Sequence, residues 1–158
     1  MSTKVSMLDL KSGGVAELPI VDRIMRAAFD ARFGEAWTTS QCMGILSMPG
    51  VWLTLAWDRE SPLGFALSRE GAGEAELLLL ATLPSHRGRG VGGALLRSVL
   101  ADARARGAKT LHLEVRSGNE AVRLYRTAGF VKVGERKNYY RGPASQLFDA
   151  HTYACELA

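Results

Sequence analysis

The sequence has few cysteines and no long apolar run. Cys42 and Cys155 are far apart in a chain of 158 residues, and no signal-peptide pattern precedes them. Two separated thiols argue against a disulfide framework and favour a reduced, cytoplasmic protein. No apolar stretch approaches the roughly 20 residues that a membrane-spanning helix needs, so we expect no membrane partner.

A strong excess of one charge is also missing. The formal net charge is +4, which favours an acidic ligand but is too small to indicate direct nucleic-acid binding. The histidines, His86, His112 and His151, show no metal-ligand spacing with the cysteines, so we predict no metal. Because no linker, repeat or low-complexity tract divides the chain, residues 1–158 are expected to form a single domain.

Hydrophobic periodicity predicts an α/β protein. Helices are expected over residues 18–33, 38–48, 91–106 and 119–128, and strands over 51–57, 63–69, 75–83, 110–116, 130–140 and 148–157. The run 75–83 is almost continuously apolar, as in a strand covered on both faces. Strands alternate with helices in the middle of the chain and the end reads as antiparallel, which predicts a mixed sheet.

Four glycines and three arginines gather in "HRGRGVGGALLRSVL", residues 86–100. The segment follows the apolar strand and leads into an amphipathic helix, where free backbone amides and the helix dipole favour an anion. No Gly-Lys-Ser/Thr of a Walker loop follows, and the Rossmann pattern is matched only loosely. The alternative is a flexible surface turn with solubilising arginines.

The spacing of Arg87, Gly90 and Gly92 matches R-x-x-G-x-G directly after "LLLLATLPSH". With these residues the chain resembles the GNAT family of acetyl-coenzyme A-dependent N-acetyltransferases. The stretch "LHLEVRSGNEAVRLYRTAGFVKVGERKNYY" and, further upstream, "GEAWTTSQ" are similar to the RimI-type N-terminal alanine acetyltransferases of that family. The resemblance covers most of the chain and is most specific over residues 76–141.

This resemblance implies a single-domain GNAT-like fold, with a mixed, mostly antiparallel sheet, a splayed central strand pair and flanking helices. It implies acetyl-coenzyme A as co-substrate, its pyrophosphate on the amides of residues 87–93 and its pantetheine arm along the strand before them. The implied coenzyme contacts are Leu80, Ala81, Thr82, Arg87, Gly88, Arg89, Gly90, Val91, Gly92, Gly93 and Asn119. Asn119 precedes Tyr125 by one residue fewer than is usual in the family, and it could instead be a helix N-cap.

Acetyl transfer to an amine needs a base for the ammonium proton and an acid for the departing thiolate. Strand alternation puts Glu114 on the face opposite Leu113. A glutamate in a central strand is costly unless it is paired or used, so Glu114 is either a base or an ion-pair partner. By resemblance Glu114 occupies the position of the general base; Glu76 is the competing carboxylate.

By resemblance, Tyr125 is the general acid, and its alternative is a core tyrosine with a bonded hydroxyl. The resemblance also places Trp37, Tyr139 and Tyr140 on the walls of a peptide groove. Each could instead be structural: Trp37 by packing against the start of the second helix, and the two tyrosines by packing at the end of their strand.

Three functions compete. The one favoured by resemblance is transfer of an acetyl group to a protein N-terminal α-amine, with an alanine such as that of the eighteenth protein of the small ribosomal subunit as acceptor. An α-amine has a pKa near 7.7–8.0 and is partly neutral at cellular pH, whereas a lysine amine is not. The others are a GNAT enzyme for a small amine and a non-catalytic coenzyme A-binding module.

Overall fold

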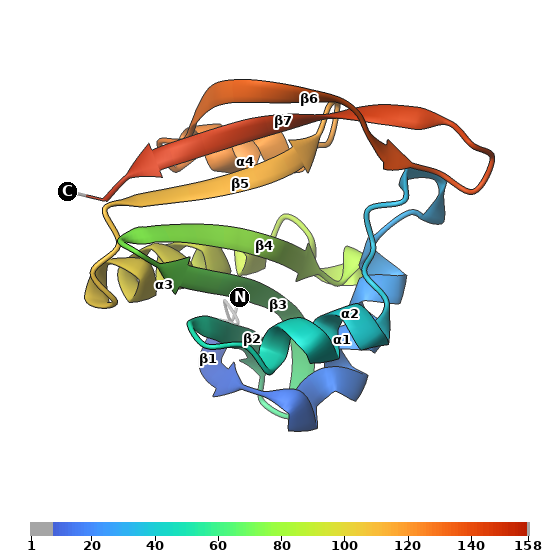
Figure 1. Cartoon of the computed structure of the whole chain (residues 1–158). Coiled ribbons are helices and arrows are strands. Elements are labelled where there is room, and N and C mark those ends of the chain that lie inside the picture. Colours follow the sequence, from blue (N-terminus) through green and yellow to red (C-terminus); the bar gives the residue numbers. More distant parts are fainter. Residues whose placement is uncertain (1–7, 158) are drawn as a thin grey trace, which may run out of the picture.

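The computed structural model describes residues 8–157, in which a seven-stranded sheet is flanked by helices (Figure 1). The strand order is β1-β2-β3-β4-β5-β7-β6. The strands are β1 (Leu8–Gly13), β2 (Val51–Asp58), β3 (Ser61–Gly71), β4 (Glu74–Thr82), β5 (Thr110–Arg116), β6 (Val131–Arg141) and β7 (Leu147–Glu156). The helices are α1 (Leu18–Ala28), α2 (Thr39–Leu46), α3 (Val91–Ala105) and α4 (Ala121–Thr127), with 3-10 turns at Val15–Glu17, Ala31–Phe33 and Pro84–His86.

Strands β4 and β5 are the parallel neighbours in an otherwise antiparallel sheet. Their pairing runs only from Glu74 opposite Thr110 to Leu77 opposite Leu113, after which the two strands diverge (Figure 1). The predicted mixed sheet with a splayed central pair is confirmed. Beyond Leu77, the edge of β4 that faces β5 is free to pair with something other than protein.

A β-bulge in β4 changes which side chains reach the two faces of the sheet. Leu67 is opposite Leu79 and Ser68 opposite Leu77, so Leu78 is the extra residue. Leu77 consequently joins the hydrophobic cluster under α3, whereas Leu79 joins the cluster under α1 and α2. The expectation that this strand is covered on both faces is wrong at Leu78 and Leu80, which are half-buried and line a cleft.

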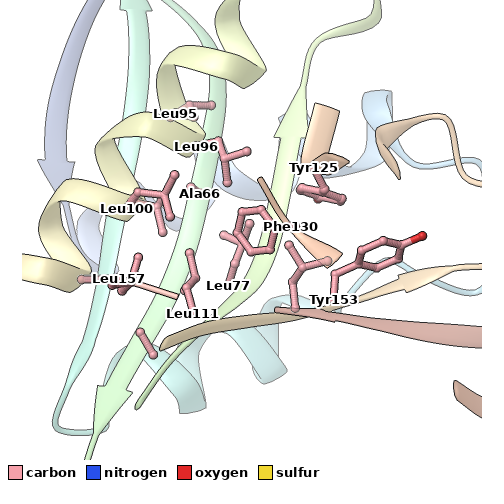
Figure 2. Close-up of a cluster of buried hydrophobic side chains, with 14 of the residues drawn as sticks. Ala66, Leu77, Leu95, Leu96, Leu100, Leu111, Tyr125, Phe130, Tyr153 and Leu157 are labelled. Carbon is pink, nitrogen blue, oxygen red and sulfur yellow. The ribbon is translucent and has the colours of Figure 1, made fainter. Parts of the chain in front are cut away.

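Two hydrophobic clusters hold the sheet, one on each face. Figure 2 shows the larger, in which Leu95, Leu96 and Leu100 of α3 pack over strands β3 to β5. The same cluster continues to Tyr125 of α4 and to Tyr153 of β7. The second cluster covers only strands β2 to β4, with α1 and α2 on top. The opposite face of the β5–β7–β6 half is consequently left more open.

The first predicted helix is too long. It ends at Ala28 instead of residue 33, because Phe29 is extended (φ −95°, ψ 128°) and a separate turn over Ala31–Phe33 follows. The fourth spans Ala121–Thr127 rather than 119–128, and β1 was not predicted. A capping box of Thr38 and Gln41 begins α2, with both of its hydrogen bonds present.

Candidate active site

A cleft of about 910 Å³ opens where β4 and β5 diverge. Its walls are the second half of β4, the turn before α3, the end of β5, the start of α4, the segment 28–37 and the end of β6. A second hollow of about 510 Å³ adjoins it and is lined by Arg69, Glu76, His112, Glu114 and Arg136, among others. Glu76 and Glu114 line both, so the two candidate bases lie where the hollows meet.

The glycine-rich turn forms one end of the cleft. Gly88 (φ +76°) and Gly90 (φ +81°) adopt the left-handed conformation that other residues rarely take. A Cβ on Gly92 would lie 3.3 Å from the Leu124 side chain, which is tight packing between α3 and α4. The glycines are therefore required partly by backbone conformation and partly by helix packing.

The backbone amides of residues 88–93 have no hydrogen-bond partner within residues 8–157, whereas the amide of Arg87 donates to Pro84 O. The first helical bond of α3 is from Ala94 N to Gly90 O. Several free N–H groups at the positive end of a helix form a site that suits a phosphate. The residues present thus fit the pyrophosphate of coenzyme A, with the free edge of β4 at Leu80, Ala81 and Thr82 beside them.

Glu114 is half-buried and makes an ion pair with Arg136 of β6 at 2.7 Å. Burial, and then the charge of Glu114, raise the pKa of Tyr139. The ion pair expected as the alternative to a base is therefore present, but its arginine is 62% exposed and the carboxylate still lines the cleft.

Glu76 is the more exposed of the two carboxylates. Its side chain is 37% exposed, against 18% for Glu114, and it pairs with Arg69 of β3 at 2.7 Å. Glu76 is opposite His112, in the part of β4 that is still hydrogen-bonded to β5. It therefore lies at the closed end of the splay, while Glu114 lies where the strands have parted.

Tyr125 belongs both to the core and to the cleft. It is 6% exposed, and its ring meets Phe130 edge-on at 5.9 Å. The hydroxyl has no hydrogen-bond partner within residues 8–157. It is not among the fully buried unpaired polar atoms of that range, and Tyr125 lines the cleft. Burial, and then the charge of Glu35, raise the pKa of this tyrosine. The structure therefore does not show the hydrogen-bonded hydroxyl that is expected of an ordinary core tyrosine.

The three predicted groove residues all line the cleft. Trp37 also packs against the α1–α2 cluster, and its backbone N–H donates to the Met25 sulfur at 3.2 Å. Tyr139 and Tyr140 meet edge-on at 5.0 Å. Packing and groove-lining are therefore not exclusive here.

Asn119 lies one residue before Glu120, the N-cap of α4, and its Oδ1 accepts from Ala121 N at 2.9 Å. Its amide group donates to Glu35 at 3.2 Å, and Arg116 pairs with the same carboxylate. Sequence reasoning missed Glu35 and Arg116. The signal for Arg116 was its alternation with Glu114 along the same open strand face.

Between residues 8 and 157, no group of three or more His, Cys, Asp or Glu side chains is arranged to hold a metal ion. In the same part of the chain, no helix combines the length and the apolar character needed to cross a membrane.

Comparison with known proteins gives a family match that spans most of the cleft residues. Residues 18–130 match the model of the Acetyltransferase (GNAT) family. The chain is 40% identical over 95 residues to a [Ribosomal protein bS18]-alanine N-acetyltransferase of Haemophilus influenzae, which is 60% of this chain and 65% of that protein. It is 42% identical over 76 residues to the N-alpha-acetyltransferase RimI of Mycobacterium tuberculosis, covering 48% of this chain and 46% of that protein. The chain thus spans less than two thirds of the length of these curated relatives.

Solved structures resemble the chain over nearly its whole length. The crystal structure of the ribosomal-protein-S18-alanine N-acetyltransferase from Escherichia coli has a TM-score of 0.85 at 26% identity, covering 96% of this chain and 95% of that one. Arabidopsis thaliana NAA60 in complex with acetyl-CoA has a TM-score of 0.83 at 18% identity, over 96% and 99% of the two chains, which establishes the fold alone. From the cleft, the glycine turn and these matches together, we conclude that the chain belongs to the GNAT family of acetyltransferases.

Proposed function

We propose that this protein transfers the acetyl group of acetyl-coenzyme A to the N-terminal α-amine of a protein, with an N-terminal alanine, as in ribosomal protein bS18, as acceptor. The observation that carries the proposal is the meeting of Glu114 and Tyr125 in one cleft, between a free strand edge and the glycine turn. The bS18-alanine and N-alpha-acetyltransferase names of the relatives support the acceptor class.

The coenzyme is held mainly by backbone. Amides of residues 88–93 bind its phosphates, and β4 pairs with the pantetheine arm at Leu80 and Thr82. Arg87 is oriented by a 2.7 Å hydrogen bond from its guanidinium to Ala28 O, which connects the turn to the end of α1. This arrangement directs the thioester, which supplies the acetyl group, toward the parted ends of β4 and β5.

Glu114 removes the proton of the acceptor ammonium, directly or through one water. Its partner Arg136 is largely exposed, so an incoming ammonium can replace the guanidinium without burying an unpaired charge. Glu76 remains in its own ion pair at the closed end of the splay. Both candidates are glutamates, so the choice of Glu114 as base rests on its position, where β4 and β5 have diverged.

Tyr125 donates a proton to the departing thiolate. Because burial raises its pKa above the usual value near 10, the hydroxyl keeps its proton through neutral and mildly alkaline pH. A thiol has a pKa of about 8.5, so the sulfur can leave as thiolate; the neutral Tyr125 hydroxyl donates a hydrogen bond to it as the charge develops, and any proton that it gives up is regained from solvent.

The acceptor chain enters between Trp37 on one side and the Tyr139–Tyr140 pair on the other. The rims come from the segment before α2 and from the end of β6, and both line the same cleft as Glu114. Two aromatic walls with open ends suit an extended peptide, whose first residue alone reaches the splay.

A panel of amines tests the proposal by the release of free thiol from acetyl-coenzyme A. It contains a peptide beginning with alanine, the same peptide with a blocked N-terminus and an internal lysine, and a polyamine. We expect transfer to the free N-terminus and little to the other two. Faster acetylation of the polyamine would instead establish a small-amine enzyme. Tight coenzyme binding without transfer to any acceptor would establish a binding module.

A further inference from the structure

Glu35 lies in the segment 29–37, which leads from α1 to α2 and passes beside the end of β6 (Figure 1). Its carboxylate makes an ion pair with Arg116, the last residue of β5. The two side chains are 11% and 13% exposed, the most buried of the ion pairs found in residues 8–157. Most surface pairs contribute little, whereas a buried pair costs desolvation of both charges.

Both oxygens of this carboxylate are used. Oε1 accepts from Arg116 Nε and Oε2 accepts from Asn119 Nδ2 at 3.2 Å. The Oδ1 of Asn119 in turn accepts from the N–H of Ala121, the first residue of α4. One carboxylate therefore joins the end of β5, which carries Glu114, to the start of α4, which carries Tyr125.

The segment that bears Glu35 is itself closely fixed. The Arg116 guanidinium is 3.6 Å from the centre of the Phe33 ring, and a Cβ on Gly34 would lie only 2.0 Å from Arg141 O. A Cβ on Gly142 would similarly lie 2.2 Å from Arg32 O. Backbone meets backbone at both points, so Glu35 is presented by a segment with little freedom to adjust.

We propose that Glu35 is a positioning residue for acetyl transfer. Its carboxylate sets the spacing between the strand of the base and the helix of the acid, and it holds the segment 29–37 as one wall of the acceptor groove. This role rests on the proposed function, because it presumes that Glu114 and Tyr125 act on the same amine and thioester. A buried ion pair is a weak source of stability. The contacts of Glu35 with Arg116 and Asn119 are therefore better explained by the need to align Glu114 with Tyr125.

Glu35→Gln tests the role because it keeps the shape but loses the charge and one of the two acceptor oxygens. We expect unchanged affinity for acetyl-coenzyme A by calorimetry and a fall in kcat of roughly tenfold or more, since misalignment acts on the chemical step. Asp22→Asn is the matched control. It removes a carboxylate that pairs with Arg26 and accepts from Thr39, away from the cleft, and it should keep the wild-type kcat.

Two further variants keep the test decisive if Glu35→Gln folds poorly. Glu35→Asp keeps the charge but shortens the side chain, and it should recover the melting temperature without recovering kcat. In a cycle with Arg116→Gln, the double variant should lose little more kcat than either single variant. A purely structural role would move the melting temperature and leave the kcat of folded protein unchanged.

The outcomes separate the two proposals. Wild-type turnover by Glu35→Gln, or an equal loss in Asp22→Asn, would overturn the positioning role alone. If the wild-type protein does not acetylate the alanine peptide, the proposed function itself fails.

Discussion

The two halves of the sheet are built differently. Strands β2 to β4 form a half that is covered on both faces, by α3 on one side and by α1 and α2 on the other. In the β5–β7–β6 half, one face packs against the α3–α4 cluster, whereas the other presents His112, Glu114 and Arg116 half-buried. Strand β6 is exposed along almost its whole length.

This difference teaches where stability and chemistry are located. Charged side chains cannot be buried cheaply unless they are paired, and both carboxylate networks of the open half, at Glu114 and at Glu35, use arginine partners. The covered half has apolar packing on both faces, whereas the open half shares only the cluster under α3 and α4. The free edge of β4, where we propose that the coenzyme binds, is the border between them.

The largest expected difference between the halves is in stability. Leu53→Ala removes a fully buried side chain of β2 and should lower the free energy of unfolding by about 2–5 kcal/mol. Val133→Ala, at a 57% exposed position of β6, should change it by about 0.5 kcal/mol or less. Denaturant unfolding of both variants checks this; equal losses would show that the open half is packed as tightly as the covered one.

Tyr125→Phe should lower turnover on the order of 10²-fold while coenzyme affinity stays the same, because only the proton for the thiolate is lost. The hydroxyl has no protein partner to lose within residues 8–157, so the melting temperature should hardly change. Single-turnover kinetics measures the chemical step. Wild-type turnover would mean that water or another residue supplies the proton.

Gly90→Val and Gly92→Val should each weaken acetyl-coenzyme A binding by about tenfold or more, since a side chain blocks the approach of phosphate to backbone. Gly90 also has a positive φ, and Gly92 faces Leu124. Gly44→Ala on α2 meets no atom within 4 Å and is the control. Unchanged affinity by calorimetry in the folded valine variants would contradict a phosphate cradle.

The smallest expected contrast is between the two thiols. Cys42 of α2 is 1% exposed and burial raises its pKa, whereas Cys155 of β7 is half-buried. A raised pKa leaves less reactive thiolate at neutral pH. Cys155 should therefore be alkylated first in the folded protein, and both should react in denaturant. Mass spectrometry of peptides identifies the modified residue. Preferential labelling of Cys42 would show that its thiol is accessible to solvent, contrary to this account.

Much of the fold follows from local pattern. The stripe from Val91 to Ala103 and the left-handed Gly107 fix α3, and strand alternation around Glu114 fixes which face of β5 is polar. What failed depends on distant partners. The edge strand β1 has no fully buried residue, so its sequence carries little periodicity. The β4 bulge depends on register with β3.

The candidate site divides along the same line. Motif and spacing were enough to locate the glycine turn, Glu114 and Tyr125, because the position of each depends on its own strand or helix. Glu35 could not, since its partner Arg116 is 81 residues away in the chain. The short end of α1 at Ala28 has a similar cause, because the segment after it must cross to β6.

The measurement that tests the central claim most directly compares wild-type protein with Glu114→Gln on an alanine-terminated peptide across about pH 6.5–9.0. If Glu114 is the base, the variant binds acetyl-coenzyme A normally and is roughly 10²–10⁴-fold slower near neutral pH. The deficit shrinks as pH rises, because more of the α-amine is already neutral, and Glu76→Gln remains close to wild type. A full-rate Glu114→Gln protein with a lowered melting temperature would contradict the account, because it would reduce Glu114 to the ion-pair partner of Arg136.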